Sequence, residues 1–248
     1  MWARLLDRCL ITPPAMWGTW PGHADLVQSG VRRGEGEAWA SWLFKQTPSA
    51  SAGLSRKAAA VPVAFVLPPG ALAFASRRFV LGVIARSTDL AGHHQPLVIY
   101  QQANAHWVKK HFEAQRYQPC DWQFWLARAV ARHMLVEDAA TAAEMTSTLK
   151  ALWRDQKRAF FARPNTGWSH AETMASARLT HALLDRRAGR APEDDPVARL
   201  QGVRHLPWAD WPQRLSGACV ENAFWQQDAQ GRFVGAANRL EDLWSGLE

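Results

Sequence analysis

The fold of this chain is constrained most by three apolar, β-rich segments between residues 61 and 100. The segments are Val61–Leu67, Phe79–Ala85 and Pro96–Tyr100. Continuous apolar runs that are bounded by turns are typical of strands whose two faces are both buried. The segments therefore predict a central sheet that is covered on both sides.

A membrane-spanning helix is the main alternative for part of this region. Residues 58–76 carry no charged side chain and approach the length that crosses a bilayer. Pro62 and the turn Pro68-Pro69-Gly70 interrupt the stretch, and in lipid they would leave backbone groups without partners. We expect two buried segments joined by a turn. Since the N-terminal residues also lack a signal-peptide pattern, we expect a soluble cytoplasmic protein without direct membrane insertion.

Helical patterns lie on either side of the strand segments. Residues 35–46 place Trp39, Trp42 and Leu43 at helical spacing, which predicts a helix that packs on the core. Other elements expected from periodicity and capping signals are helices at Asp121 to Met134, at 141–161, at Ser169 to Gly189 and at 238–247, and a hairpin whose turn is Asp228 to Gly231.

The order of these elements predicts a layered domain. With 248 residues, 48% of them hydrophobic, the chain can bury one sizeable core. A mixed sheet, then helices, then a late hairpin favours the α/β or α+β class. We predict a single domain over 1–248. It has a core at about 5–105, a mostly helical part at about 106–216, a hairpin at about 217–235 and a short terminal helix.

Charge and cysteine content narrow the functional classes. The net charge of +7 makes nucleic-acid binding worth considering. The basic residues, however, form short scattered clusters, so we interpret the charge as a contribution to solubility and not as a binding surface. Only residues 106–117 interleave aromatic and basic side chains as a single-strand-binding surface does, so a nucleic-acid-binding module stays an alternative. Three distant cysteines, Cys9, Cys120 and Cys219, are consistent with a reducing compartment.

Two loops carry the residues that could perform chemistry. The sequence has no nucleophile elbow, phosphate-binding loop or dinucleotide fingerprint. His23 and Asp25 lie in one loop, and Asp89 and His93 lie in another. Imidazole and carboxylate groups are the usual metal and acid–base ligands, so a metal-dependent enzyme that uses these four residues is a second alternative.

The second loop also has a purely structural interpretation. His93 and His94 are adjacent, and adjacent side chains of an extended segment point to opposite faces, so both rarely reach one metal. A turn explains the same residues. In this interpretation an aspartate caps the turn, Gly92 has a positive φ, and the histidines are exposed to solvent. We favour this interpretation over a catalytic or metal site.

The two loops, taken in order, resemble the TagF family, whose members accompany bacterial type VI secretion systems. Residues 18–30 resemble its opening motif Gly-Lys-Leu-Pro-x-x-Gly-Asp-Phe, and a helix with paired Trp follows. Residues 61–70 resemble Pro-x-Trp-Arg-Phe-x-Leu-x-Pro-Gly, and 81–100 resemble Gly-Val-x-x-Pro-Ser-x-Asp-x-x-Gly-Arg-x-Phe-Pro-Leu-x-Ile. The matching residues are Gly18, Pro21, Asp25, Trp39, Trp42, Gly82, Val83, Ser87, Asp89, Gly92, Pro96, Leu97 and Ile99; Ala24, Arg86, His94 and Gln95 depart from the pattern.

The resemblance implies a non-enzymatic regulator without a cofactor or metal. Members act after translation in the cytoplasm and hold the secretion apparatus inactive by binding its components, notably a forkhead-associated scaffold protein. The implied fold is an α/β three-layer sandwich, a central sheet with helices on both faces. We predict that the partner-facing or loop-defining residues are Trp20, Pro21, His23, Asp25, Ser87, Asp89, Gly92, His93 and Pro96.

Overall fold

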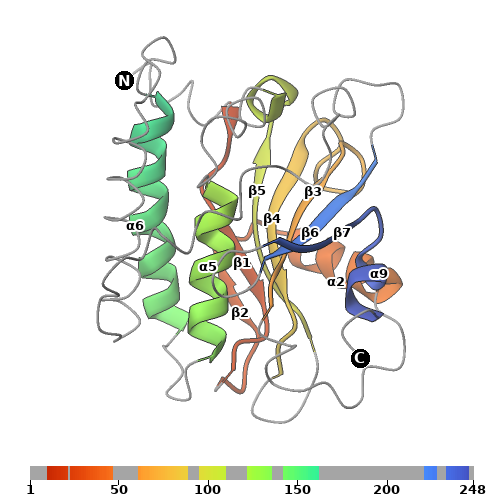
Figure 1. Ribbon diagram of the computed structural model, residues 1–248, viewed down its shortest axis with the longest axis vertical. Coiled ribbons are helices and arrows are strands. Elements are labelled where there is room, and N and C mark those ends of the chain that lie inside the picture. The colour runs from red at the N-terminus through yellow and green to blue at the C-terminus, as the bar shows by residue number, and fades with distance from the viewer. Residues whose placement is uncertain are drawn as a thin grey trace.

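One antiparallel sheet organises the molecule (Figure 1). The computed structural model describes residues 10–21, 23–46, 61–88, 95–109, 122–135, 142–161, 221–227 and 233–245. The described strands form one seven-stranded sheet in the order β2-β1-β5-β4-β3-β6-β7. Their bounds are β1 Ala15–Gly18, β2 Val27–Ser29, β3 Val63–Leu67, β4 Phe79–Ala85, β5 Leu97–Ala103, β6 Ala223–Gln227 and β7 Phe233–Ala237.

The three apolar segments form the central strands, as predicted. Every residue of β3, β4 and β5 is buried, and β4 pairs with β3 on one side and with β5 on the other. The strand β5 runs to Ala103, beyond the predicted end at Tyr100, because the polar Gln101 and Gln102 continue the ladder. Sequence hydrophobicity missed this extension.

The prediction of a mixed sheet is wrong, since all described pairs are antiparallel. Parallel neighbours need a crossover that returns the chain to the same end of the sheet, usually through a helix. The connection at 68–78 is fully described and contains turns and bends but no helix, and it returns the chain directly in the opposite direction. Continuous apolar strands arise here because an antiparallel sheet is covered on both faces.

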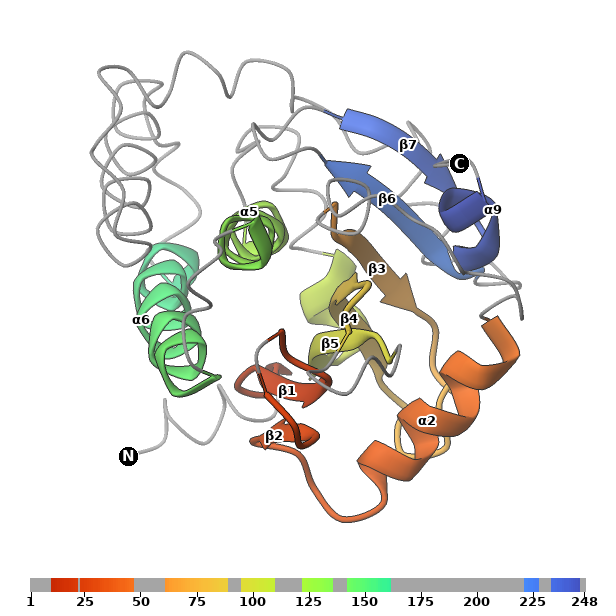
Figure 2. The ribbon, with the colours of Figure 1, turned by 90° about the horizontal axis from the view of Figure 1, so that it is seen from below.

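Helices lie on both faces of the sheet (Figure 2). The helices α2 (Glu35–Gln46) and α9 (Leu240–Ser245) cover one face, and α5 (Trp122–Leu135) and α6 (Ala142–Phe161) lie on the other. Alternation along β3 explains why both faces need cover. Phe65 packs in the cluster under α2 and α9, while its neighbours Ala64 and Val66 pack in the cluster under α5 and α6.

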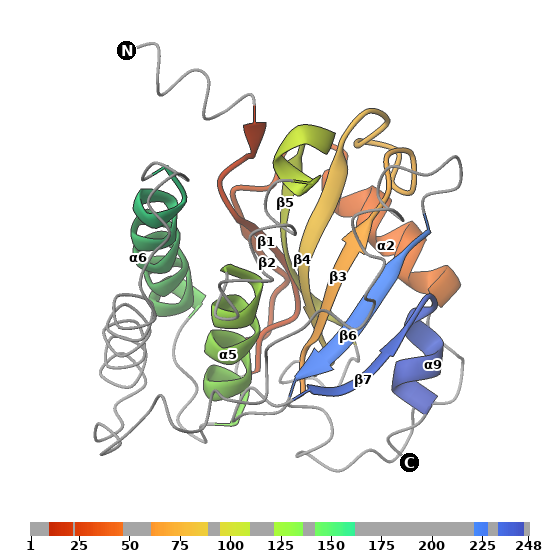
Figure 3. The same cartoon turned by 45° about the horizontal axis from the view of Figure 1, so that its top comes forward.

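The α/β class is confirmed, and so are several helices. The helices at 35–46, 122–135, 142–161 and 240–245 match the sequence predictions, and β6 and β7 form the two strands of the late hairpin (Figure 3). Residues 169–189, Asp121, the turn Asp228 to Gly231 and the three cysteines lie outside the described residues. The three-layer sandwich and the domain division of the whole chain stay predictions.

The apolar stretch 58–76 is not a membrane span. Residues 63–67 form β3, Pro69 and Gly70 form a turn, and Leu72 and Ala75 beyond the turn are buried again. Gly70 has a φ of 87°. No helix among the described residues is long and apolar enough to cross a membrane.

Trp39 anchors α2 to the sheet. Its side chain is fully buried, and its ring centroid lies 5.2 Å from that of Tyr100 and 5.7 Å from that of Phe65. Both contacts are edge-to-face, the geometry that aromatic pairs favour. The helix therefore sits over the junction of strands that lie on opposite sides of β4.

Replacing Trp39 by Ala is expected to lower the free energy of unfolding by about 3–5 kcal/mol, because it opens a cavity among these rings. Urea denaturation of the two proteins measures the difference. Phe44→Ala on the same helix is the matched control, since Phe44 is 86% exposed, and its change is expected within about 0.5 kcal/mol. Equal effects of the two substitutions would contradict this account of α2.

Candidate functional site

The hairpin of β1 and β2 forms one edge of the sheet. β1 pairs with β5 on its inner side and with β2 on its outer side, and all four of its residues are buried. β2 is only partly buried. The loop at residues 19–26, which lies within the first motif, connects the two strands. The edge therefore joins a buried anchor to an accessible strand.

The two predicted loops meet at the base of this hairpin. Thr19 donates a hydrogen bond from Oγ1 to the carbonyl oxygen of Gln95. Gly18 has a φ of 130°, and a Cβ placed on it would lie 2.2 Å from the carbonyl oxygen of Pro96. Only glycine fits both the backbone angle and the close approach. The opening motif and the second loop are thus held together by backbone contact.

His23 ties the first loop to α6. The backbone N–H of His23 donates to the carbonyl oxygen of Trp20 at 3.1 Å, which closes a turn. The backbone N–H of Ala142, at the start of α6, donates to Nε2 of His23 at 3.4 Å. An imidazole nitrogen that accepts this bond satisfies one of the unpaired amides of a helix start. Trp20 is fully buried beneath the loop.

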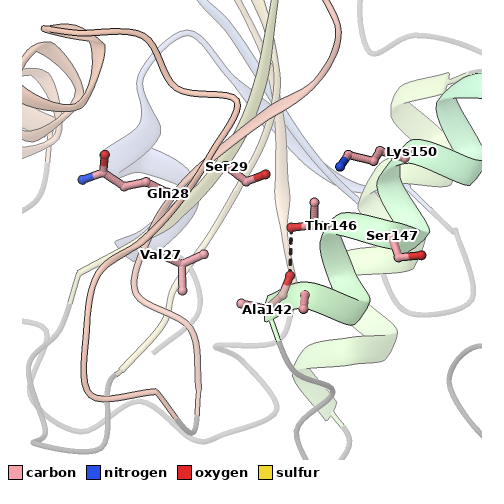
Figure 4. Close-up of a pocket in the computed structure, with 8 residues that line it drawn as sticks. Val27, Gln28, Ser29, Ala142, Thr146, Ser147 and Lys150 are labelled. Atoms are coloured by element: carbon pink, nitrogen blue, oxygen red, sulfur yellow. Dashed lines mark hydrogen bonds between the residues drawn. The ribbon is translucent and has the colours of Figure 1, made fainter.

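Two grooves flank β2, one on each side of the strand. The α6 groove, of about 480 Å³, lies between Val27 to Ser29 and the first half of α6. The α2 groove, of about 570 Å³, lies between the hairpin and the start of α2. In Figure 4, Lys150 extends from α6 toward Ser29, while Gln28 points to the opposite side of the strand. Both grooves border the same three-residue strand.

A buried carboxylate holds the start of α2 beside these grooves. Glu35 accepts the backbone N–H of Arg32 at 2.9 Å and the hydroxyl of Tyr100 at 2.6 Å, both at Oε2. Gln102 donates from Nε2 to Oε1 at 2.8 Å. Burial raises the pKa of the Tyr100 phenol well above its usual range, and the bond to Glu35 and its negative charge act in the same direction.

This network is structural. All three donors come from the protein interior or the backbone of the same turn, so the carboxylate is engaged in positioning α2 on β5. Sequence reasoning missed Glu35 and Tyr100. The available signal was a glutamate at a helix start, where its carboxylate can accept a backbone N–H that precedes the helix, much as the glutamate of a capping box does. The polar pair Gln101-Gln102 at the end of an apolar strand was a second signal.

The start of α2 also lies very close to β1. A Cβ on Gly36 would come within 2.7 Å of Nε1 of Trp17, so this helix position requires glycine. The approach brings Arg32 and Arg33, which precede the helix and are both exposed, to the rim of the α2 groove. Local packing therefore sets the positions of two cations.

The predicted site residues fall into two groups. Among those described, Trp20 is buried, Pro21 and His23 are half-buried, Asp25 is exposed, and Pro96 touches Gly18. Ser87 is buried, and its Oγ has no hydrogen-bond partner among the described residues. Asp89, Gly92 and His93 lie outside the described residues. The partner-facing role of this set stays a prediction.

Only two of the four proposed metal ligands, His23 and Asp25, lie among the described residues. In the described ranges, no three His, Cys, Asp or Glu residues are grouped as a metal site requires. His23 uses Nε2 to accept the bond from Ala142, and Asp25 is exposed. Since Asp89 and His93 lie outside those ranges, the structure does not test the four-residue constellation.

The basic aromatic stretch at 106–117 is described only at its start. Residues 105–109 are helical, with Trp107 and Val108 buried and His106 and Lys109 exposed. An alternation of this kind is typical of an amphipathic helix whose aromatic residue packs in the core. In this part of the stretch, Trp107 is therefore unavailable for base stacking.

The comparison with protein-family models agrees with the motif pattern. A family model described as TagF N-terminal domain, type VI secretion system-associated, matches residues 15–152. The crystal structure of PA0076 from Pseudomonas aeruginosa PAO1 is similar at 17% sequence identity and a TM-score of 0.42, over 70% of this chain and 77% of that one. No curated protein matches this chain. The family match spans both loops, both grooves and the Glu35 network.

Tyr100→Phe is expected to make the folded protein about 1–3 kcal/mol less stable near neutral pH, because Glu35 loses a buried donor. The folded pKa of Tyr100 is raised, so its stabilising effect is complete below the unfolded pKa of about 10 and is lost progressively as the pH rises from there toward the raised folded pKa. The stability gap between wild type and variant should therefore stay constant up to about pH 9 and narrow progressively as the pH rises above about 10.

Urea unfolding of both proteins across this pH range measures the gap. All other side chains are the same in the two proteins, so their contributions cancel in the difference. A gap that stays constant through the alkaline range would show that Tyr100 ionises equally in the folded and unfolded chains.

Proposed function

The chain belongs to the TagF family of type VI secretion-associated proteins, whose N-terminal domain model matches residues 15–152 of its 248 residues, and we propose that it restrains a bacterial type VI secretion system by binding the system's components. The family match carries this proposal. The order and spacing of the loop motifs, which include Gly18, Pro21 and Asp25, add support. In this role the protein is a post-translational negative regulator that works in the cytoplasm.

Protein binding, and not catalysis, is the proposed mode of action. The buried titratable pair next to the grooves, Glu35 and Tyr100, makes its hydrogen bonds inside the fold, where the bonds support α2. The side chains at the rims of the grooves include Gln28, Arg32 and Lys150. Amide and cationic groups on an accessible edge are suited to contacts with a polypeptide. The proposal needs no cofactor.

The proposed partner is the forkhead-associated scaffold protein of the same secretion system. The proposed contact surface is the edge built by the loops 19–26 and 86–96. It contains Trp20, Pro21, His23, Asp25, Ser87, Asp89, Gly92, His93 and Pro96. Contact between Thr19 and Gln95 supports the idea that the two loops act as one surface.

The proposed architecture of the whole chain is one three-layer α/β sandwich over residues 1–248. Two observations support it. The late strands β6 and β7 extend the same sheet as β1 to β5, and described helices lie on both faces of that sheet. In this arrangement the first half and the end of the chain share one core.

Copurification tests the proposed partner. The tagged intact chain is expected to retain the forkhead-associated scaffold of its own secretion system, and its overproduction is expected to lower export of that system's substrates. If the intact chain did not retain the scaffold, that result would contradict the proposed mode of action.

A matched pair of histidine variants tests the contact surface. His23→Ala should weaken retention by about fivefold or more, because the loop 19–26 loses its bond to α6 and no longer presents one shape. His106→Ala is the control, since His106 is exposed on a different segment. If the two variants retained the scaffold equally well, the loop 19–26 would not be part of the surface.

A further inference from the structure

The outer edge of β2 is available for pairing. β2 ends the strand order of the sheet, and none of the described residues pairs with its outer side. Gln28 is exposed, and Val27 and Ser29 are half-buried. An edge strand of this kind presents backbone N–H and C=O groups that can template another strand.

β2 is short, which limits how far its edge can pair, but it lacks the other common devices that block such edges. Charged residues, prolines and bulges discourage edge pairing in natural sheets. β2 contains only Val27, Gln28 and Ser29, and its register with β1 is regular. At the opposite edge, the pairing of β7 with β6 shifts register at Gln226 and Gln227. The two edges of the sheet therefore differ in how readily they can be extended.

The grooves lie where the side chains of an added strand would go. Successive side chains of a strand point to opposite faces, so a segment paired with β2 would place them alternately toward α6 and toward α2. The α6 groove, of about 480 Å³, lies on one side, and the α2 groove, of about 570 Å³, lies on the other. Leu26, 38% exposed, gives the α2 groove an apolar contact.

The charges of the grooves indicate what kind of segment fits. Lys150 reaches over the α6 groove toward β2 (Figure 4), and Arg32 and Arg33 border the α2 groove. The charged residues on the two linings are these three cations and one acid, Glu37. Acidic side chains on alternate positions of an added strand would lie near these cations.

We propose that β2 binds an extended acidic segment of a partner protein as an eighth strand, with its side chains seated alternately in the α6 and α2 grooves. Main-chain hydrogen bonds to β2 supply affinity, and the two grooves supply selectivity for side chains. This inference rests on the proposed function, because it names the mode by which the chain holds a protein partner.

A second copy of this chain fits the edge less well. Two β2 strands paired with each other would bring together the cations of two identical surfaces, and like charges across an interface are unfavourable. The net charge of +7 on each chain adds to this repulsion. Charge complementarity therefore selects an acidic partner over self-association.

Synthetic peptides test strand addition directly on the intact chain. The probe is a fluorescent peptide of about seven residues, a typical strand length, that alternates Val and Glu. Anisotropy should show binding that weakens with salt, and the peptide with Lys in place of Glu should bind at least about tenfold more weakly. Equal binding of the two peptides, or binding of neither, would overturn the proposal.

N-methylation distinguishes main-chain pairing from attraction of charges alone. Two versions of the acidic peptide carry N-methyl groups on its odd or on its even residues. Only one edge of an added strand pairs with β2, so one version should lose binding and the other should keep it. If both versions bound like the parent peptide, the segment would not be added as a strand.

The two arginines provide matched variants. Arg32→Gln with Arg33→Gln keeps the backbone N–H that donates to Glu35, so the fold should persist, and acidic-peptide affinity should fall about fivefold to tenfold. Lys45→Gln with Arg77→Gln is the control, because both residues are exposed and neither lines a groove. An equal loss in the control pair would contradict a specific site.

The same variants separate this inference from the proposed function. If the Arg32/Arg33 variant retained the scaffold protein as well as wild type does, the edge would not be the binding site, although regulation by binding would stand. If the intact chain bound the acidic peptide but no scaffold, strand addition would stand and the proposed partner would fall.

Discussion

Burial of both faces of β3, β4 and β5 is the constraint on which the rest of the structure depends. Each of these strands carries apolar side chains on both sides, so the sheet gains stability only when other elements cover both. α2 and α9 cover one side, and α5 and α6 lie on the other. Covered faces cannot bind a partner. The accessible parts of the sheet are its edges, and the candidate site lies at one of them.

Close backbone contact turns that edge into a defined surface. Gly18 packs against Pro96, and Thr19 bonds to Gln95, so the start of the first loop and the end of the second meet at one point. His23 then fixes the first loop to α6. These contacts join β1, β5 and α6 around β2. A short, half-exposed strand gains a fixed position from neighbours that are themselves part of the core.

The buried Glu35 shows how the interior sets the charge of the same surface. Its carboxylate is compensated by a backbone amide, a phenol and a side-chain amide, which satisfies the requirement that a buried charge be hydrogen-bonded. The bond to the Arg32 amide fixes the turn that carries Arg32 and Arg33. Two exposed cations therefore owe their place beside the α2 groove to a buried residue.

The amino-acid sequence by itself determined the elements with strong patterns. Continuous apolar runs predicted the central strands, and helical spacing around Trp39 predicted α2. Both predictions work because the burial of an element fixes where apolar residues occur along its sequence. Motif order also identified the family. The antiparallel direction of the strands was not predicted, since apolar runs record burial but not direction.

Only the tertiary structure decided which distant residues meet. Glu35 lies 65 positions from Tyr100, and Thr19 lies 76 from Gln95. No local pattern encodes such pairs, since each is selected by how the sheet and helices pack together. The grooves beside β2 arise in the same way, because their walls come from α2, α6 and the first hairpin. Sequence periodicity specifies what each element buries, and packing specifies which surface remains.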